Sequence, residues 1–148
     1  PGTVDAAVLY RKHAAAAGIE IEVVRVPGDG YWSNVGMKKP WGAYYWGGRP
    51  TEDWMFSTAY MGGASWNDTF WKNDRFDKLL IQARAETDQN KRREMYYEMQ
   101  QIVRDKGGVV VPMFANYVFG TSDKIAHGTM AGNWDLDGEK FHERWWYS

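Results

Sequence analysis

Two charged side chains, Arg49 and Asp53, lie in the most aromatic part of the sequence, residues 41–76. The chain of 148 residues contains nine Trp, nine Tyr and six Phe, and this part is dense in all three. An arginine among aromatic rings can hold a carboxylate through two parallel hydrogen bonds, and an aspartate there can hold an ammonium group or hydroxyls. Aromatic rings with a few polar groups are typical of a small-molecule site. The pattern therefore predicts a ligand-binding surface in which Arg49 and Asp53 make the charged contacts.

Two structural explanations fit the same residues. Arg49 and Asp53 could form a salt bridge with each other, and the aromatic stretch could be a core or a subunit contact rich in tryptophan. Glycine pairs at 47–48 and 62–63 favour the binding site, because glycine lets the backbone approach a ligand closely. Both explanations stay open at this point.

Composition argues against several other kinds of site. Cysteine is absent, which excludes disulfides, thiolate metal sites and a cysteine nucleophile. His13, His127 and His142 are far apart and lack the spacing of metal ligands. The net charge of −1 provides no electrostatic footprint for nucleic acid. We therefore expect no metal, no cofactor, no nucleic-acid partner and no enzymatic activity.

The elements that would position the charged pair alternate between helical and strand patterns. A helix is predicted over about 4–17, with Thr3 as its cap and Gly18 just after its end. A short helix is predicted over 31–37, and another has Pro50 in its first turn and Glu52 and Asp53 in its early positions. Strand patterns cover 19–23, 43–46 and 109–114, and 117–119 could form another. This alternation predicts an α/β fold.

A helical hairpin is the clearest element. Its first helix places Phe76, Leu79, Leu80 and Ala83 on one face, behind a cap at Asn73 or Asp74. Its second helix follows residues 87–90 and a cap at Asp88. The apolar stripe of that second helix contains Met95, Met99 and Ile102, with Tyr96 and Val103 beside it.

Taken in order, several segments resemble the C-terminal part of the extracellular solute-binding proteins of ABC importers, the dipeptide, oligopeptide and nickel-binding family (family five). The resemblance covers nearly the whole chain. The segments that carry it are Val4–Val8, Ala17–Val23, Trp46–Asp53, Asn73–Leu80 with Ala83-Arg84, and Thr87-Asp88 followed by Lys91-Arg92, Tyr96-Tyr97, Gln101–Val103 and Val110–Phe114. Their order and spacing are more specific than any one of them.

The resemblance implies part of the second lobe of a two-lobed (type II) periplasmic binding protein. Residues 1–120 would belong to that lobe, and residues 121–148 would be a tail returning toward the first lobe. The implied function is to capture a peptide or similar small solute between the lobes and deliver it to an ABC permease in the membrane. The implied location is the periplasm, or the outer face of the membrane to which the protein is tethered.

The chain starts with Pro-Gly and shows neither a signal peptide nor a run long enough to span a membrane. We therefore expect a piece of a longer protein, in which the N-terminal lobe of the same protein is a further partner.

The resemblance also implies roles for individual residues. Asp53 best matches the acid that contacts the ammonium group of the ligand in peptide-binding members. Arg-Pro-Thr-Glu-Asp replaces the usual Asp-Pro-Asp-like sequence at 49–53. An arginine there would suit an acidic ligand or no ligand at all, rather than a dipeptide. Asn67 would provide a neutral hydrogen bond. The aromatic walls would come from Trp46 and Trp66, with Tyr31 and Trp32 as further wall residues.

Two other classes of function remain open. Tryptophan platforms also suit sugars, so the chain could be a carbohydrate-binding or carbohydrate-active module. A glycosidase needs two carboxylates that flank one bond, and the neighbouring Glu52 and Asp53 would point about 100° apart on a helix. The third possibility is an interaction domain built on a helical hairpin with an aromatic core.

Overall fold

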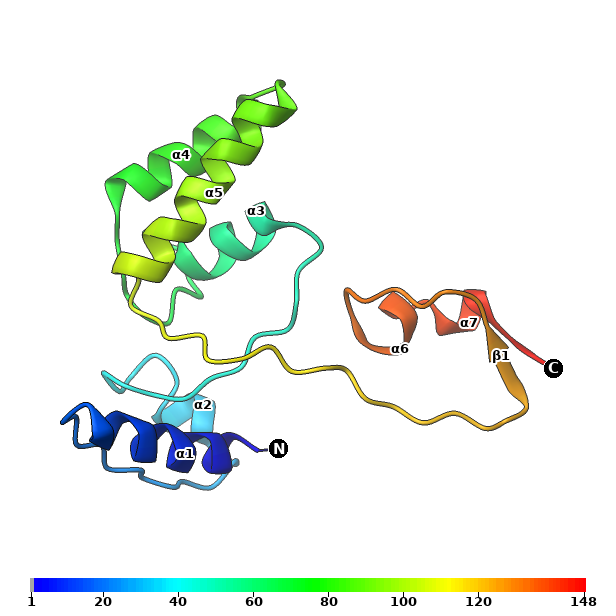
Figure 1. The fold of residues 1–148 in the computed structure, drawn as a ribbon, viewed down its shortest axis with the longest axis horizontal. Coiled ribbons are helices and arrows are strands. Elements are labelled where there is room, and N and C mark those ends of the chain that lie inside the picture. The colour runs from blue at the N-terminus through cyan, green and yellow to red at the C-terminus, as the bar shows by residue number, and fades with distance from the viewer. Residues whose placement is uncertain (1) are drawn as a thin grey trace. The chain divides into compact units, whose positions relative to one another are not determined.

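The structure, a computed structural model, describes residues 2–148. Contacts within the chain divide it into two units, Pro1–Trp46 and Gly47–Ser148, and each is described by itself. The division falls at a different place from the expected boundary at residue 120. Figure 1 follows the chain from its N-terminus in blue to its C-terminus in red.

The first unit contains α1 (Thr3–Ala16) and α2 (Tyr31–Asn34). Gly18 ends α1 as expected: it adopts a left-handed φ of 76°, and the amides of Gly18 and Ile19 donate to the carbonyls of Ala15 and Ala14. The predicted cap at Thr3 is wrong, because Thr3 is the first helical residue and follows a left-handed Gly2. None of the described residues of this unit adds a hydrophobic side chain to the buried core.

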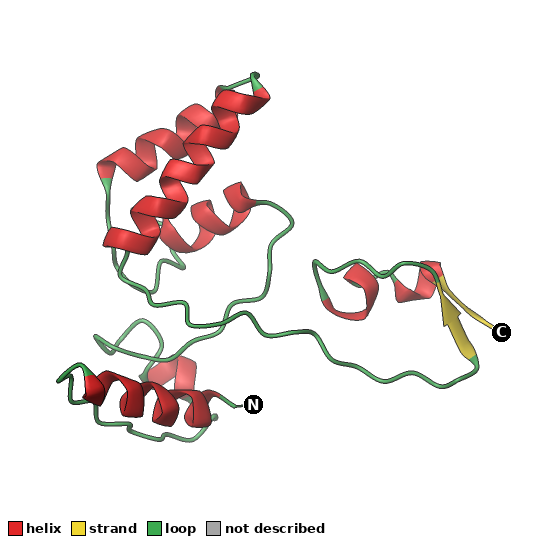
Figure 2. Ribbon diagram, in the orientation of Figure 1, coloured by secondary structure: helices red, strands yellow, loops and turns green. Residues whose placement is uncertain are grey.

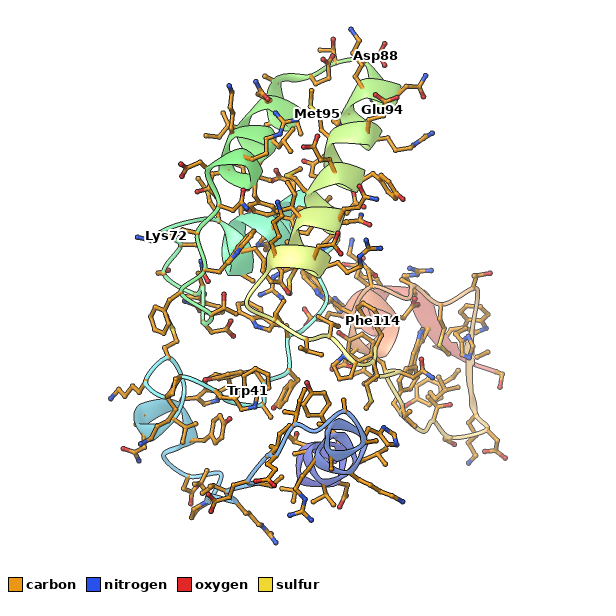
Figure 3. The ribbon with its side chains drawn as sticks, turned by 60° about the vertical axis from the view of Figure 1, so that its left-hand side comes forward. Trp41, Lys72, Asp88, Glu94, Met95 and Phe114 are labelled. Atoms are coloured by element: carbon orange, nitrogen blue, oxygen red, sulfur yellow. The ribbon has the colours of Figure 1, made fainter. Side chains whose placement is uncertain are left out.

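The second unit is built on a helical hairpin, α4 (Asp74–Ala85) and α5 (Gln89–Lys106), against which α3 (Glu52–Met55) and the π-helical turn η1 (Phe56–Tyr60) pack (Figure 1). The predicted caps are confirmed at Asn73, whose Oδ1 accepts from the Phe76 amide at 3.0 Å, and at Asp88, whose Oδ1 accepts from the amides of Asn90 and Lys91. Figure 3 labels Asp88 at the turn where α5 begins.

The core of the second unit confirms the predicted helix faces. The buried cluster consists of Phe56, Phe76, Leu79, Leu80, Ala83 and Met99. Phe56 of η1 packs against Phe76 of α4 with the ring centroids 5.3 Å apart, so η1 is held on the hairpin by its own aromatic side chain. The helix predicted with Pro50 in its first turn begins two residues later, at Glu52 of α3. Thr51 is its cap, because the Thr51 hydroxyl oxygen accepts from the Trp54 amide.

The strands predicted at 19–23, 43–46 and 109–114 are wrong for the described chain, and so is the possible strand at 117–119. These residues form loops, and most of the structure is helix or loop in Figure 2. Strand formation requires a neighbouring strand for the backbone N–H and C=O groups, and within residues 2–148 these segments have none. Alternating or continuous apolar residues indicate which side chains favour burial, but they do not provide the neighbour.

The strands that do form lie at the C-terminal end, where periodicity in the sequence fades. There β1 (Ile125–His127) pairs antiparallel with β2 (Trp145–Tyr147), with Ala126 opposite Trp146. Between them lie the single turns α6 (Asp135–Gly138) and α7 (Phe141–Arg144). We name residues 125–148 the C-terminal hairpin region. Among the described residues, the structure thus has helices and one two-stranded antiparallel sheet. The two-lobed α/β fold expected from the sequence remains a proposal.

Asp137 holds the C-terminal hairpin region together. Its carboxylate is 2% exposed, accepts from the Ala131 amide and the Trp145 indole, and pairs with Arg144 at 3.2 Å. Leu136 and Asp137 have left-handed φ values of 46° and 64°, which cost energy in residues other than glycine. The buried hydrogen bonds and ion pair of Asp137 offset that cost.

Candidate functional site: an aromatic cavity on the second unit

The second unit contains a pocket of about 520 Å³ beside η1 that is open to solvent, and we call it the cavity. Its walls come from the segment before α3, from α3 and η1, and from the loop after η1. The residues that line it are Arg49, Trp54, Ser57, Thr58, Ala64, Ser65 and Trp66. Two of the residues predicted from the sequence, Arg49 and Trp66, therefore share one cavity.

Arg49 is held in place by its own backbone neighbours and by an aromatic ring. Its guanidinium donates to the carbonyls of Gly47 at 2.9 Å and Gly48 at 3.2 Å, and its Cζ lies 5.7 Å from the ring centroid of Trp54. Gly47 and Gly48, the predicted glycine pair, provide these two carbonyl oxygens. The side chain thus presents a fixed positive charge at the cavity.

The hydroxyl groups of η1 contribute acceptors to the cavity. Ser57 Oγ donates to the carbonyl of Asp53 at 2.7 Å, and Thr58 Oγ1 donates to the carbonyl of Trp54 at 2.7 Å. Each hydroxyl carries one proton, so this donation leaves the oxygen lone pairs as the groups that a ligand can meet. Helix residues of these types bond back to the preceding turn in this way.

Two tryptophan rings supply the apolar walls of the cavity. Trp54 is 46% exposed and Trp66 is 59% exposed, which is high for side chains of this size. Trp134 packs edge to face on Trp54 with centroids 6.1 Å apart, and its indole donates to the Gly48 carbonyl at 2.7 Å. The sequence analysis did not predict Trp54 or Trp134 as residues of the site. The signal that could have identified them is a tryptophan next to polar residues of a turn.

Asp53 lies outside the cavity lining and has partners of its own. Its carboxylate accepts two hydrogen bonds from Arg84 of α4, at 2.8 and 3.0 Å, and one from the Tyr96 hydroxyl of α5 at 3.1 Å. Burial of the Tyr96 ring, followed by the charge of Asp53, raises the pKa of Tyr96 to about 12. Asp53 thereby joins α3 to both helices of the hairpin, and we do not carry it into the proposed ligand site.

Asn67 is also used by the protein itself. It is 4% exposed, its amide donates to the carbonyls of Met61 and Trp71, and its oxygen accepts from Thr69 at 3.0 Å. The side chain closes the loop between η1 and α4, which carries Trp66 into the cavity. Its role is structural, so we leave it out of the proposed site as well.

The remaining predicted residues, Tyr31, Trp32 and Trp46, belong to the first unit. Tyr31 packs edge to face on Trp32 at 5.7 Å and on Tyr44 at 6.1 Å, and its hydroxyl donates to the Ala43 carbonyl at 2.8 Å. Trp46 is half-buried at the end of that unit. They are described within the first unit and form no part of the cavity argument.

Residues 2–148 contain no group of three or more His, Asp or Glu side chains arranged to hold a metal ion. Within the same residues, no helix combines the length and the apolar character needed to cross a membrane.

Comparison with known proteins adds no assignment: no family model, no curated protein and no solved structure matches this chain.

Proposed function

We propose that this chain is part of the substrate-binding component of an ABC importer, which captures a peptide or similar small solute and delivers it to a membrane permease. The observation that carries the proposal is the cavity in which Arg49, Trp54 and Trp66 meet. It has the size and the mixture of apolar walls and few polar groups that are typical of a small-molecule site. The transport role and the location, periplasmic or tethered to the outer face of the membrane, rest on the resemblance to family five, in which several segments follow in the same order and spacing.

The mechanism that we propose is closure of the first, N-terminal lobe over the cavity. The exposure of Trp54 and Trp66 supports it. Removing these large aromatic surfaces from water, under a ligand and a covering lobe, lowers the free energy and so stabilises the closed form. Contacts made only in the closed form would shift an equilibrium between open and closed states toward closure. A permease that binds the closed form would then receive the loaded protein.

A carbohydrate-binding function is the second candidate. The hydroxyls of Ser57, Thr58 and Ser65 next to two exposed tryptophan rings favour it, because sugars stack on aromatic faces and bond to hydroxyls. A fixed arginine at the cavity favours a charged solute instead, so we place the importer first.

The test is to identify the solute that the protein retains. We expect mass spectrometry of protein purified without denaturation to find a small organic anion, and tryptophan fluorescence to change when that compound is added back to stripped protein. Membrane vesicles that contain the cognate permease should accumulate the compound only when the binding protein is added. A neutral oligosaccharide as the retained compound would support the second candidate, and the absence of any bound solute would contradict both.

A further inference from the structure

Gly48 is the point at which three parts of the second unit meet. Its carbonyl accepts from the Trp134 indole at 2.7 Å, and its amide donates a longer, weaker bond to the Tyr117 hydroxyl at 3.4 Å. These partners lie 86 and 69 residues away in the sequence. The same carbonyl accepts from Arg49 of the cavity lining. The peptide group of Gly48 therefore joins the C-terminal hairpin region and the loop after α5 to the edge of the cavity.

The approach of the C-terminal hairpin region to Gly48 is close enough to exclude a side chain there. A Cβ atom on Gly48 would lie 3.2 Å from the carbonyl oxygen of Asn133, which is closer than an ordinary van der Waals contact. A Cβ atom on Gly47 would meet Nη1 of Arg49 at 3.6 Å, an ordinary contact. Neither glycine adopts a left-handed φ, so alanine fits the backbone at both positions. The two glycines therefore differ in the space that the C-terminal hairpin region leaves them.

Trp134 also contacts the wall of the cavity. Its ring packs edge to face on the ring of Trp54 with the centroids 6.1 Å apart. Trp54 lines the cavity, whereas Trp134 lies behind it and outside the lining. Any effect of Trp134 on a solute must therefore act through Trp54 and through the peptide group of Gly48.

The turn that carries Trp134 is held by contacts inside the C-terminal hairpin region. The buried carboxylate of Asp137 accepts from the Ala131 amide and so closes the turn on both sides of Trp134. The hydrogen bond from Trp134 to Gly48 is exposed to solvent, and an exposed neutral bond stabilises only weakly. The region can therefore dock on Gly48 and leave it as a folded piece.

We propose that Trp134 is a positioning residue, through which docking of the C-terminal hairpin region holds the Gly48 turn and the Trp54 ring in the arrangement that binds the solute. This inference rests on the proposed function, because it names what regulates the same cavity. Linked equilibria are reciprocal, so docking raises the affinity for the solute and the bound solute stabilises docking by the same factor. A partner that holds the region away from Gly48 weakens solute binding accordingly.

The first arm of the experiment needs no solute. The full chain is labelled with 5-fluorotryptophan and stripped of bound solute, and its fluorine NMR spectrum is recorded. Gly48→Ala should shift the resonances of Trp54 and Trp134, because the new methyl group displaces the carbonyl of Asn133. Gly47→Ala is the matched control and should leave both resonances near their wild-type positions.

A second pair of variants tests the indole itself. Trp134→Phe keeps an aromatic ring against Trp54 but removes the N–H that bonds to Gly48, and it should shift the Trp54 resonance. Trp146→Phe changes an exposed tryptophan of the same region and should leave Trp54 unmoved. The resonance of Trp145, whose indole donates to the buried carboxylate of the region, checks that the region stays folded in each variant.

The second arm titrates each stripped variant with the compound that mass spectrometry identifies on the purified protein. Trp134→Phe and Gly48→Ala should each weaken binding by about 5-fold, the effect of one neutral hydrogen bond, and Gly47→Ala and Trp146→Phe by less than about 2-fold. In the wild-type protein this compound should shift the resonance of Trp134, although Trp134 lies outside the lining, and leave that of Trp146 unmoved.

The outcomes separate this inference from the proposed function. Wild-type affinity in Trp134→Phe and Gly48→Ala would overturn the inference and leave the importer function intact. So would a Trp134 resonance that the retained compound does not move, or equal losses of affinity in Gly47→Ala and Gly48→Ala. If the purified protein retains no solute, the proposed function and the linkage are both wrong.

Discussion

Asn67 lies in the middle of a buried hydrogen-bond group, and its removal should therefore affect folding before binding. Asn67→Ala leaves the carbonyls of Met61 and Trp71 without their donor in a part-buried loop. We expect the free energy of unfolding to fall by about 1–3 kcal/mol, the usual cost of an unsatisfied buried group. Urea denaturation measures this, with the exposed Asn116→Ala as the control. Unchanged stability together with lost solute binding would return Asn67 to the ligand site.

Asp137 makes the C-terminal hairpin region sensitive to acid. The hydrogen bond from the Ala131 amide, followed by that from the Trp145 indole and by the positive charge of Arg144, lowers the pKa of this carboxyl. Because the folded pKa lies below the unfolded one, its stabilising effect is present above the unfolded pKa and is lost as the pH falls through the folded pKa.

We therefore expect the fluorescence of Trp145 to report loosening of this region on acidification. Asp137→Asn should lower the stability of the region at neutral pH and flatten its response to acid. Asp135→Asn, a change of an exposed carboxylate in the same turn, serves as the control. An unaltered acid profile in Asp137→Asn would contradict the role given to this residue.

At the scale of elements, α3 depends on the hairpin for its position. Asp53 contacts Arg84 of α4 and Tyr96 of α5, and it immediately precedes Trp54 of the cavity. We expect Arg84→Met to lower the free energy of unfolding by less than about 1 kcal/mol, because both partners are partly exposed. The same variant should shift the fluorine NMR resonance of 5-fluorotryptophan at Trp54.

Arg75→Met is the matched control for this prediction. It breaks a bidentate pair with Glu98 that also joins α4 to α5 but does not touch α3. We expect a similar small loss of stability and an unmoved Trp54 resonance. Equal shifts of Trp54 in both variants would mean that the Asp53 contacts do not position the cavity wall.

The same contacts predict the titration of Tyr96. Its pKa of about 12 exceeds the ordinary 10.0 because the ring is buried and Asp53 is negatively charged. The stabilisation that this provides is complete below about pH 10 and is lost as the pH rises through about 12. Ultraviolet difference titration against Tyr96→Phe measures the pKa, and Asp53→Asn should lower it. An unchanged value would contradict the Asp53 contact.

The hairpin was predictable from the sequence because its information is local. Asn73 and Asp88 cap their own helices, and the buried face of α4 follows from spacing alone. The partner of Asp53 was not predictable, because Arg84 lies 31 residues away and becomes a neighbour only when α3 packs on the hairpin. Arg49 and Trp66 could be predicted to lie near each other because both belong to the same short aromatic stretch, residues 41–76, and both line the cavity. The predicted strands failed for the opposite reason, since strand pairing depends on residues that the local pattern does not contain.

At the scale of the whole molecule, residues 107–122 form a long uncharged stretch. It runs as a loop after α5, and its side chains include Phe114, 93% exposed, and Val118, 90% exposed. Figure 3 labels Phe114 on this loop. Apolar surface of this kind, with strand-forming residues and no charge, favours association.

We therefore expect concentration-dependent self-association, measured by sedimentation velocity. The double variant Phe114→Lys, Val118→Lys should reduce it, whereas Ile81→Lys on the exposed face of α4 should change it less. A wild-type protein that stays monomeric at high concentration would contradict the prediction that residues 107–122 drive association.

The central claim is that the cavity beside η1 binds the solute, and fluorine NMR of protein labelled with 5-fluorotryptophan tests it most directly. Resonances are assigned by single Trp→Phe variants, and the retained solute is titrated into stripped protein. Our account predicts that the resonances of Trp54 and Trp66 shift in proportion to occupancy, while that of Trp145 in the C-terminal hairpin region does not. Saturable binding that leaves both Trp54 and Trp66 unmoved would place the solute elsewhere and contradict the account.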